Sequence, residues 1–218
     1  MKILITAGPT REYIDDVRFL SNASSGRMGY SLAAAAIRLG HQVVLVTGPV
    51  ELPVPAGCEV HSIETTDQLR QACVRLFPLC DGVIATAAVC DYRPIRRVSG
   101  KMSKTGQPVT LELVETSDVL AELGMQKEHR WIVGFALESQ DPRNNAMRKL
   151  RMKQCNCIVL NDTSAISSLT NSVEVLNSSA ETVATFQGRK EDIAMSLMQF
   201  IESFTSTQNT SSGSPEGK

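Results

Sequence analysis

The segment SLAAAAIRLGHQVVLVTG, residues 31–48, passes from one apolar period to another within a short stretch. Its first part continues a pattern with three- and four-residue spacing, which predicts a helix over residues 27–39 that ends at Gly40. Its second part is continuously apolar and β-branched, which is typical of a strand buried on both faces. A helix followed directly by such a strand is the repeating unit of a parallel α/β sheet.

The same alternation continues along the chain and predicts a Rossmann-like α/β fold, a three-layer sandwich with a mostly parallel sheet and helices on both faces. Thr66 is expected to cap the second helix, which Pro78 closes. An antiparallel hairpin is expected at one edge of the sheet. The predicted strands are KILITAG (2–8), HQVVLVTG (41–48), EVHSIE (59–64), DGVIATAAV (81–89), WIVGFALE (131–138), NCIVLND (156–162) and the hairpin 172–187; the further helices are 65–77, 141–154 and 190–204.

Two segments depart from this pattern. Residues 92–108, YRPIRRVSGKMSKTGQP, are basic and polar, and we call this predicted exposed loop the flap. Residues 205–218 are rich in Ser, Thr and Gly and cannot bury a core, so we expect a disordered tail after a single domain that covers residues 1–204.

Composition limits the classes of function. The chain has 218 residues and a net charge of −1, so no bulk charge favours nucleic acid or a membrane surface. No apolar run approaches the roughly 20 residues that cross a bilayer. Six cysteines form no CxxC pair or zinc spacing. They predict free thiols in a reducing, cytoplasmic environment, and the start of the chain favours a first strand over a signal peptide.

The polar motifs follow the predicted strands. TAGPTR, TGP, TAAVCDYRP, the end of GFALE and ND each stand at a strand's carboxyl end. Ligands of open α/β sheets bind beyond those ends, so the motifs are expected on one rim.

The loop FLSNASSGRMGY, residues 19–30, matches neither GxGxxG nor the Walker pattern. Ser24, Ser25 and Gly26 precede a helix, where they form either a simple turn and cap or a cradle for an anion. Arg18 and Asn22 supply donors suited to phosphate or carboxylate, which favours the cradle.

Other polar residues have two readings from sequence alone. Lys101 and Lys104 in the flap, and Lys149 and Lys153 on one helix face, either decorate the surface or meet phosphates. Asp91 either caps a loop or contacts a ribose hydroxyl or a metal-bound phosphate. No Ser-His-Asp or Cys-His arrangement is present, and none of the three histidines is placed as a catalytic group.

Seven motifs in order carry a resemblance to a known family. They are ITAGPTRE, VRFLSNASSGRMG, TAAVCDYRP, GKMSK, VGFALE, KLRMK and LND. From about residue 2 to about residue 204 the chain resembles the bacterial, CTP-dependent phosphopantothenoylcysteine synthetases (phosphopantothenate–cysteine ligases) of coenzyme A biosynthesis.

The resemblance implies a ligase that joins 4′-phosphopantothenate to L-cysteine. CTP with Mg²⁺ activates the carboxylate as an acyl-cytidylate and releases pyrophosphate; the cysteine amine then expels CMP. No protein nucleophile is required, but charge stabilisation is. Many relatives fuse this part to a flavin-dependent decarboxylase. Because this chain starts at its first strand, we expect neither that activity nor a flavin, and a separate phosphopantothenoylcysteine decarboxylase becomes a candidate partner.

The resemblance also assigns residues. It makes Asn22, Arg18 and Lys101 catalytic, Arg18, Asn22 and Ala88 substrate-binding, and no protein side chain a metal ligand. Family members are dimers whose flap helps to complete a neighbour's site. Arg27 and Ser103 stand where relatives usually have lysine. The nucleotide-binding residues that the resemblance implies are Ser24, Ser25, Gly26, Ala87, Ala88, Asp91, Lys101, Phe135, Lys149 and Lys153.

Two rival functions stay open at this point. A nicotinamide-dependent dehydrogenase lacks support, because GxGxxG and a Tyr-x-x-x-Lys pair are both absent. A non-catalytic module that binds nucleotides or phosphorylated ligands is compatible with the same motifs. The choice of CTP over ATP is also left open.

Overall fold

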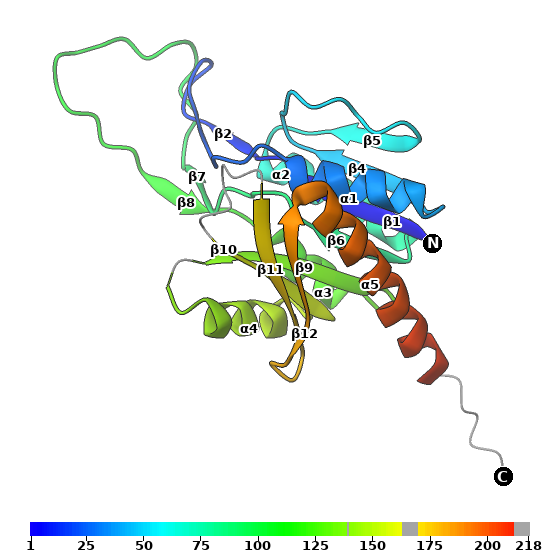
Figure 1. Cartoon of the computed structure of the whole chain (residues 1–218). Coiled ribbons are helices and arrows are strands. Elements are labelled where there is room, and N and C mark those ends of the chain that lie inside the picture. The colour runs from blue at the N-terminus through cyan, green and yellow to red at the C-terminus, as the bar shows by residue number, and fades with distance from the viewer. Residues whose placement is uncertain (139, 163–169, 212–218) are drawn as a thin grey trace.

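The computed structural model describes residues 1–138, 140–162 and 170–211. Its main element is an eight-stranded sheet in which six neighbouring strands are parallel and the last two, β11 and β12, are antiparallel (Figure 1). This confirms the predicted fold class and the edge hairpin. In spatial order the strands are β12 (Thr182–Arg189), β11 (Thr170–Asn177), β10 (Cys157–Asp162), β9 (Trp131–Glu138), β6 (Gly82–Ala85), β1 (Lys2–Ala7), β4 (Gln42–Thr47) and β5 (Cys58–Ser62).

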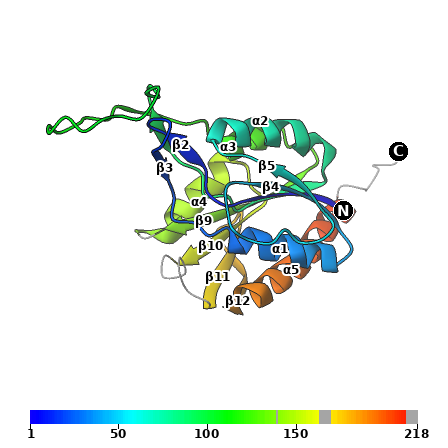
Figure 2. The same cartoon turned by 90° about the horizontal axis from the view of Figure 1, so that it is seen from above.

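Helices cover both faces of the sheet, as Figure 2 shows in projection. Helices α1 (Arg27–Arg38) and α5 (Lys190–Ser211) share one face. Helices α2 (Thr66–Leu76), α3 (Val119–Met125) and α4 (Pro142–Met152) share the other, and a short 3-10 helix, Phe77–Leu79, follows α2. Helix α5 continues beyond residue 204, where the domain was expected to end, and residues 212–218 lie outside the described residues.

The central strands are apolar on both faces because each face has its own core. In β1, Ile3 and Ile5 pack with α1 and α5, whereas Leu4 packs with α2 on the other side. All three side chains are fully buried, and complete burial of such a side chain is worth about 1.5–3 kcal/mol.

The connections place a switch point beside β1. The chain runs from β1 to β4 and β5 on one side, then returns to β6 on the other side of β1 and continues to β9 and β10. Neighbouring crossovers therefore diverge between β1 and β6, which opens a crevice at their carboxyl ends.

The expected cap of α2 is wrong by one residue. Thr65, not Thr66, accepts the N–H of Gln68 at 3.2 Å, and Gln68 returns a bond to the Thr65 N–H at 3.3 Å. Thr66 is buried instead, and its N–H donates to Glu12 Oε1 at 2.8 Å. This reciprocal arrangement is a capping box, so helix entry is still fixed by threonine.

Two small antiparallel pairs stand outside the main sheet. Strands β2 (Arg11–Tyr13) and β3 (Phe19–Ser21) pair with each other, and the flap begins with β7 (Tyr92–Pro94), which pairs with β8 (Leu113–Glu115). The flap leaves the body beside β2 (Figures 1 and 2). None of these four short strands was predicted.

The cysteines are free thiols, as expected. Burial raises the pKa of Cys73 and of Cys157 to about 12 and that of Cys155 to about 11, so these thiols stay neutral at physiological pH. None of the described helices has the length and apolarity needed to cross a membrane.

Candidate active site

A cleft of about 980 Å³ lies at the switch point, where it is bordered by the ends of β1, β6 and β9 and by the starts of α1 and α3. It brings together most of the residues that the sequence singled out. Those that line it are Asn22, Ser24, Ser25, Gly26, Ala87, Ala88, Asp91, Phe135, Lys149 and Lys153.

The start of α1 presents an anion-binding end to this cleft. Gly26 is the N-cap residue in a left-handed conformation (φ 72°), and no side chain caps the helix. The first intrahelical bond of the next turn runs from the Tyr30 N–H to the Gly26 carbonyl. The N–H groups of residues 27–29 therefore have no acceptor within the helix, and all three residues line the cleft.

Glycines allow α1 to approach the sheet this closely. A Cβ at Gly29 would lie 2.5 Å from Thr86 Oγ1 and 2.6 Å from the Ala7 Cβ. A Cβ at Gly26 would meet Val50 at 2.9 Å. The loop SSGRMG therefore seats the start of the helix, with its positive dipole end, against the ends of β1 and β6.

The loop after β6 is fastened to the end of β1 through its backbone. The Ala88 N–H donates to the Gly8 carbonyl at 2.9 Å, and the Ala88 carbonyl accepts from the Thr10 N–H at 3.2 Å. The Ala87 N–H donates to Thr6 Oγ1 at 3.2 Å. The small side chains of Ala87 and Ala88 thus line a wall of the cleft whose position is fixed.

Asn22 contributes to the same wall. Its amide nitrogen donates to the Ala88 carbonyl at 3.1 Å and to the Val89 carbonyl at 2.8 Å. The sequence analysis assigned this amide to a ligand, whereas here its donors hold the loop after β6. Asn22 therefore sets the shape of the cleft that it lines.

Cations gather around the cleft from three helices. Lys149 and Lys153 come from α4 and its end, and Lys153 forms an ion pair with Asp118 at 3.1 Å. Arg27 begins α1 and Lys190 begins α5. Burial, with a contribution from Arg27, lowers the pKa of Lys190. An anion in the cleft would relieve this crowding of positive charge.

The sequence analysis missed several polar residues of the cleft. Arg148 adjoins Lys149, and that basic run was a usable signal. Lys190 and Asp118 gave no such sequence signal, because each is an ordinary charged residue at a helix start. The further polar side chains that line the cleft are Thr6, Thr86, Tyr92, Glu115, Thr116, Ser117, Asn145 and Asn161.

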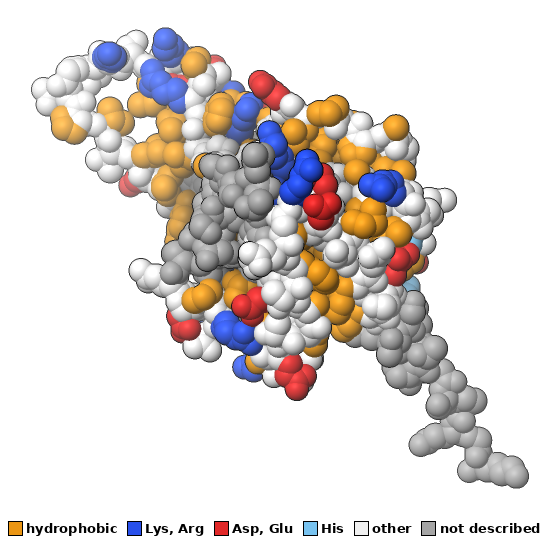
Figure 3. Space-filling view, in the orientation of Figure 1, with side chains coloured by type: hydrophobic (Ala, Val, Ile, Leu, Met, Phe, Trp, Pro, Cys, Tyr) orange, Lys and Arg blue, Asp and Glu red, His pale blue; other side chains and the backbone are white. Residues whose placement is uncertain are grey.

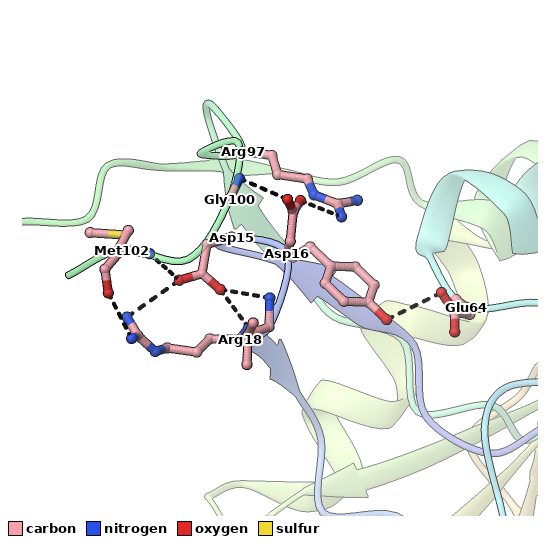
Figure 4. Close-up of polar contacts among 9 residues, drawn as sticks. Asp15, Asp16, Arg18, Glu64, Arg97, Gly100 and Met102 are labelled. Atoms are coloured by element: carbon pink, nitrogen blue, oxygen red, sulfur yellow. Dashed lines mark hydrogen bonds and ion pairs between the residues drawn. The ribbon is translucent and has the colours of Figure 1, made fainter.

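Arg18 and Lys101, two of the three residues expected to be catalytic, are not among the residues that line the cleft. Arg18 pairs with Asp15 at 3.3 Å and donates to the Met102 carbonyl at 2.9 Å (Figure 4). Lys101 is an exposed residue of the flap. Within one chain these two residues belong to the base of the flap.

In the described parts of the chain no three His, Cys, Asp or Glu side chains gather as potential metal ligands. Asp91 is an exposed carboxylate on the cleft wall, and its backbone carbonyl accepts from Thr116. It remains available to a ligand.

Comparison with known proteins now adds the family. Residues 1–204 match the model of the DNA/pantothenate metabolism flavoprotein C-terminal domain. The chain belongs to this family. It is 46% identical over 164 residues to the coenzyme A biosynthesis bifunctional protein CoaBC of Bacillus subtilis, an alignment that covers 75% of this chain and 40% of that protein.

A second relative carries the name of a different enzyme. The cysteine/cysteine sulfinic acid decarboxylase of an unknown prokaryotic organism is 43% identical over 162 residues, which cover 73% of this chain and 45% of that protein. The chain thus spans less than half the length of the curated relatives it matches.

Solved structures agree with the fold. The crystal structure of the C-terminal domain of CoaBC superposes with a TM-score of 0.80 at 36% identity, covering 94% of this chain and 96% of that one. A complex of Cab2 with phosphopantothenate-cysteine has a TM-score of 0.81 at 14% identity, covering 96% and 88% of the two chains. The latter likeness shows the fold alone.

Proposed function

We propose that this chain is a phosphopantothenate–cysteine ligase of coenzyme A biosynthesis, which joins 4′-phosphopantothenate to L-cysteine and uses CTP. One observation carries the proposal: the helix start at Gly26 and the surrounding cations form a cleft for a polyanion, in a chain that matches the C-terminal domain of CoaBC over nearly its whole length.

The proposed reaction has two steps. A carboxylate oxygen of phosphopantothenate attacks the α-phosphorus of CTP, which forms the acyl-cytidylate and releases pyrophosphate. The cysteine amine then attacks the acyl carbon, which forms the amide and releases CMP. Negative charge accumulates during the first step, and we assign its stabilisation to the N–H groups at the start of α1 with Lys149 and Lys153, which line the cleft.

The remaining cleft residues suit the nucleotide. Phe135 is a half-buried ring on β9 that can pack against a base, and Asp91 can accept from a ribose hydroxyl. We assign Mg²⁺ to the triphosphate, where it would neutralise charge on the leaving pyrophosphate.

We further propose that the protein is a two-fold dimer in which the flap reaches a neighbour's cleft. Arg18 and Lys101 lie outside their own chain's cleft, which supports this exchange. The flap and β8 also expose apolar side chains that a monomer would leave in water (Figure 3). These side chains are Tyr92, Ile95, Val98, Leu113 and Val114.

Release of pyrophosphate tests the proposed ligase. The full chain, phosphopantothenate, CTP and Mg²⁺ should yield pyrophosphate, and L-cysteine should convert the intermediate into phosphopantothenoylcysteine and CMP. Replacing CTP by ATP tests the choice of nucleotide. A purified, folded chain that binds CTP but releases no pyrophosphate would favour the non-catalytic alternative, and the absence of any change in NADH fluorescence would exclude the dehydrogenase.

A further inference from the structure

Asp15 lies in the turn between β2 and β3, and its carboxylate is fully buried. One oxygen accepts the N–H groups of Val17 at 2.8 Å and of Arg18 at 2.7 Å, within the turn itself. The other oxygen accepts the N–H of Met102 at 3.1 Å, from a residue far along the chain in the flap. Asp15 thus joins two segments that share no sheet.

Its neighbour Asp16 makes a second link to the flap. Asp16 Oδ2 accepts the Gly100 N–H at 2.7 Å, and its own N–H donates to the Gly100 carbonyl at 3.2 Å. Its other oxygen pairs with Arg97 at 2.9 Å. Figure 4 shows Asp15 and Asp16 facing the flap together, and we call these two residues the acidic clamp.

The clamp holds the residues on either side of Lys101. Gly100 is bound through both its N–H and its carbonyl by Asp16. Met102 is bound through its N–H by Asp15 and through its carbonyl by the Arg18 side chain. Lys101 itself is exposed, so its position is set by contacts of its neighbours' backbone.

The charge state of the clamp favours these bonds. Burial raises the pKa of the Asp15 carboxyl, but the N–H bonds from Val17, Arg18 and Met102 outweigh burial and hold the pKa below its ordinary value. The bond from Gly100 and the contact with Arg97 lower the pKa of Asp16. Both groups are therefore carboxylates at neutral pH, with acceptor oxygens only.

The same hairpin also leads to the cleft. Strand β3 follows the clamp, and Asn22, directly after it, is bonded to the loop of Ala88 and Val89. Ser21 Oγ donates to the Thr10 carbonyl at 2.7 Å and fastens β3 near the end of β1. Contacts therefore run without a break from the cleft wall to the flap.

We propose that Asp15, assisted by Asp16, is a positioning residue that fixes Lys101 for the activation step by holding the flap backbone at Met102 and Gly100. The role of Lys101 in activation rests on the proposed function. The placing of the flap by the clamp does not, and the two can be tested apart.

Amide hydrogen exchange tests the placing of the flap directly. In Asp15→Asn the amide keeps one acceptor oxygen, which satisfies two N–H groups when it faces Val17 and Arg18, so the Met102 N–H is the partner that loses its bond. We expect amides of residues 97–104 to exchange about tenfold faster than in the wild type. Asp16→Asn, at an exposed position that tolerates the change, should act in the same direction and covers the case in which Asp15→Asn fails to fold.

Asp81→Asn is the matched control, because Asp81 also accepts a backbone N–H, from Lys2 at 2.6 Å, but belongs to neither clamp nor cleft. It should leave exchange in the flap unchanged. Flap exchange at the wild-type rate in folded Asp15→Asn, or in Asp16→Asn if the first variant does not fold, would overturn the proposal whether or not the protein is a ligase.

A double-mutant cycle tests whether Asp15 acts through Lys101. Asp15→Asn alone should lower the rate of pyrophosphate release by about 10- to 100-fold, since small misplacements of a catalytic group have effects of that size. In a Lys101→Gln background the same change should have no further effect on the rate. If the two effects multiply, Asp15 is merely structural and the positioning role is refuted.

The two proposals fail in different ways. If the wild type releases no pyrophosphate but Asp15→Asn still speeds amide exchange in the flap, the ligase proposal and the link to activation are refuted. The clamp proposal then stands. If the wild type is an active ligase but amide exchange in the flap is unchanged in both clamp variants, the clamp proposal is refuted and the ligase proposal stands.

Discussion

The cleft and the flap differ in what holds them in place. The cleft wall is built on the buried core: Gly29 sits against Ala7 at the end of β1, and backbone bonds join Ala88 to Gly8. The flap has exposed side chains along most of its length and is held at its base by the acidic clamp. Substitutions in the cleft wall should therefore change stability and activity together, whereas substitutions in the flap should change activity alone.

The largest effect is expected in the flap. Lys101→Gln should lower the rate of pyrophosphate release by about 10²–10³, the usual loss when one transition-state donor is removed. Its thermal unfolding should match the wild type, because Lys101 is exposed. Lys104→Gln is the matched control and should retain activity. Near-normal pyrophosphate release by Lys101→Gln would contradict the assignment.

The next effect should appear in the cleft wall. Replacing an interior helix glycine by alanine normally stabilises a helix, but Gly29→Ala would force a methyl group against Thr86 and Ala7. We expect a loss of about 1–3 kcal/mol in the free energy of unfolding, with weaker nucleotide binding. Denaturant unfolding and CTP titration would measure both.

Gly106→Ala provides the contrast for that experiment. Gly106 lies in the flap with a positive φ of 73°, yet nothing lies within 4 Å of the added methyl group. The positive φ disfavours alanine by about 1 kcal/mol, but no steric clash adds to that cost, so the loss in the free energy of unfolding should be smaller than in Gly29→Ala. Equal losses in the free energy of unfolding in the two variants would contradict the inference that the core supports the cleft wall but not the flap.

Asn22→Asp should have a smaller effect, at the boundary between the regions. The new carboxylate would face the carbonyls of Ala88 and Val89 without a donor, which should shift the loop that lines the cleft. We expect the second half-reaction to slow by about tenfold, more than the first, so that acyl-cytidylate accumulates. Chromatography of quenched reactions with and without cysteine would reveal it.

Asn22→Ala separates charge repulsion from the loss of the two hydrogen bonds, because it removes the bonds without adding a charge. The rate of its second half-reaction should lie between those of the wild type and Asn22→Asp. Conversion of the intermediate to product at the wild-type rate by folded Asn22→Asp would mean that the position of this loop does not matter for the second step.

The smallest change in a measured quantity is expected in the mass of the assembly. Light scattering of the wild type should give twice the single-chain mass of 23.7 kDa. Val114→Asp on β8 should shift the protein toward the monomer, whereas Leu79→Asp, at a still more exposed position in the 3-10 helix after α2, should not. A wild-type mass near that of one chain at micromolar concentration would refute the dimer.

The sequence predicted the cleft well for a physical reason. Buried parallel strands are long apolar runs, and the motifs that follow them must meet at one rim. Asp91 was found in this way and Ser24 by its place before a helix, whereas Ala88 and Phe135 came from the family resemblance; the structure places all four around one cleft. Residues at helix starts, such as Lys190, were missed because their positions depend on how α5 packs beside α1.

The flap was predicted only as a basic, exposed loop. Its short strands have three residues each, too few for a period to be recognised. The hydrogen bond from Met102 to Asp15 joins residues 87 positions apart, and no local sequence pattern predicts it. Arg18 illustrates the limit: its residue type indicated anion binding, but its neighbours in space are Asp15 and the Met102 carbonyl.

Apart from the ion pair between Asp16 and Arg97, the acidic clamp holds the flap through peptide groups, whose N–H every residue except proline carries in the same form. The identity of the side chain at Met102 is therefore of little consequence to the attachment, while Asp15 can be replaced by no other residue that offers two acceptor oxygens at that reach. Related chains should keep this attachment through wide drift at the other flap positions as long as the glycine at 100 and the carboxylates at 15 and 16 are kept, although activity would still require the lysine at 101. A flap taken from such a relative should therefore bind to the turn between β2 and β3 without any change in that turn.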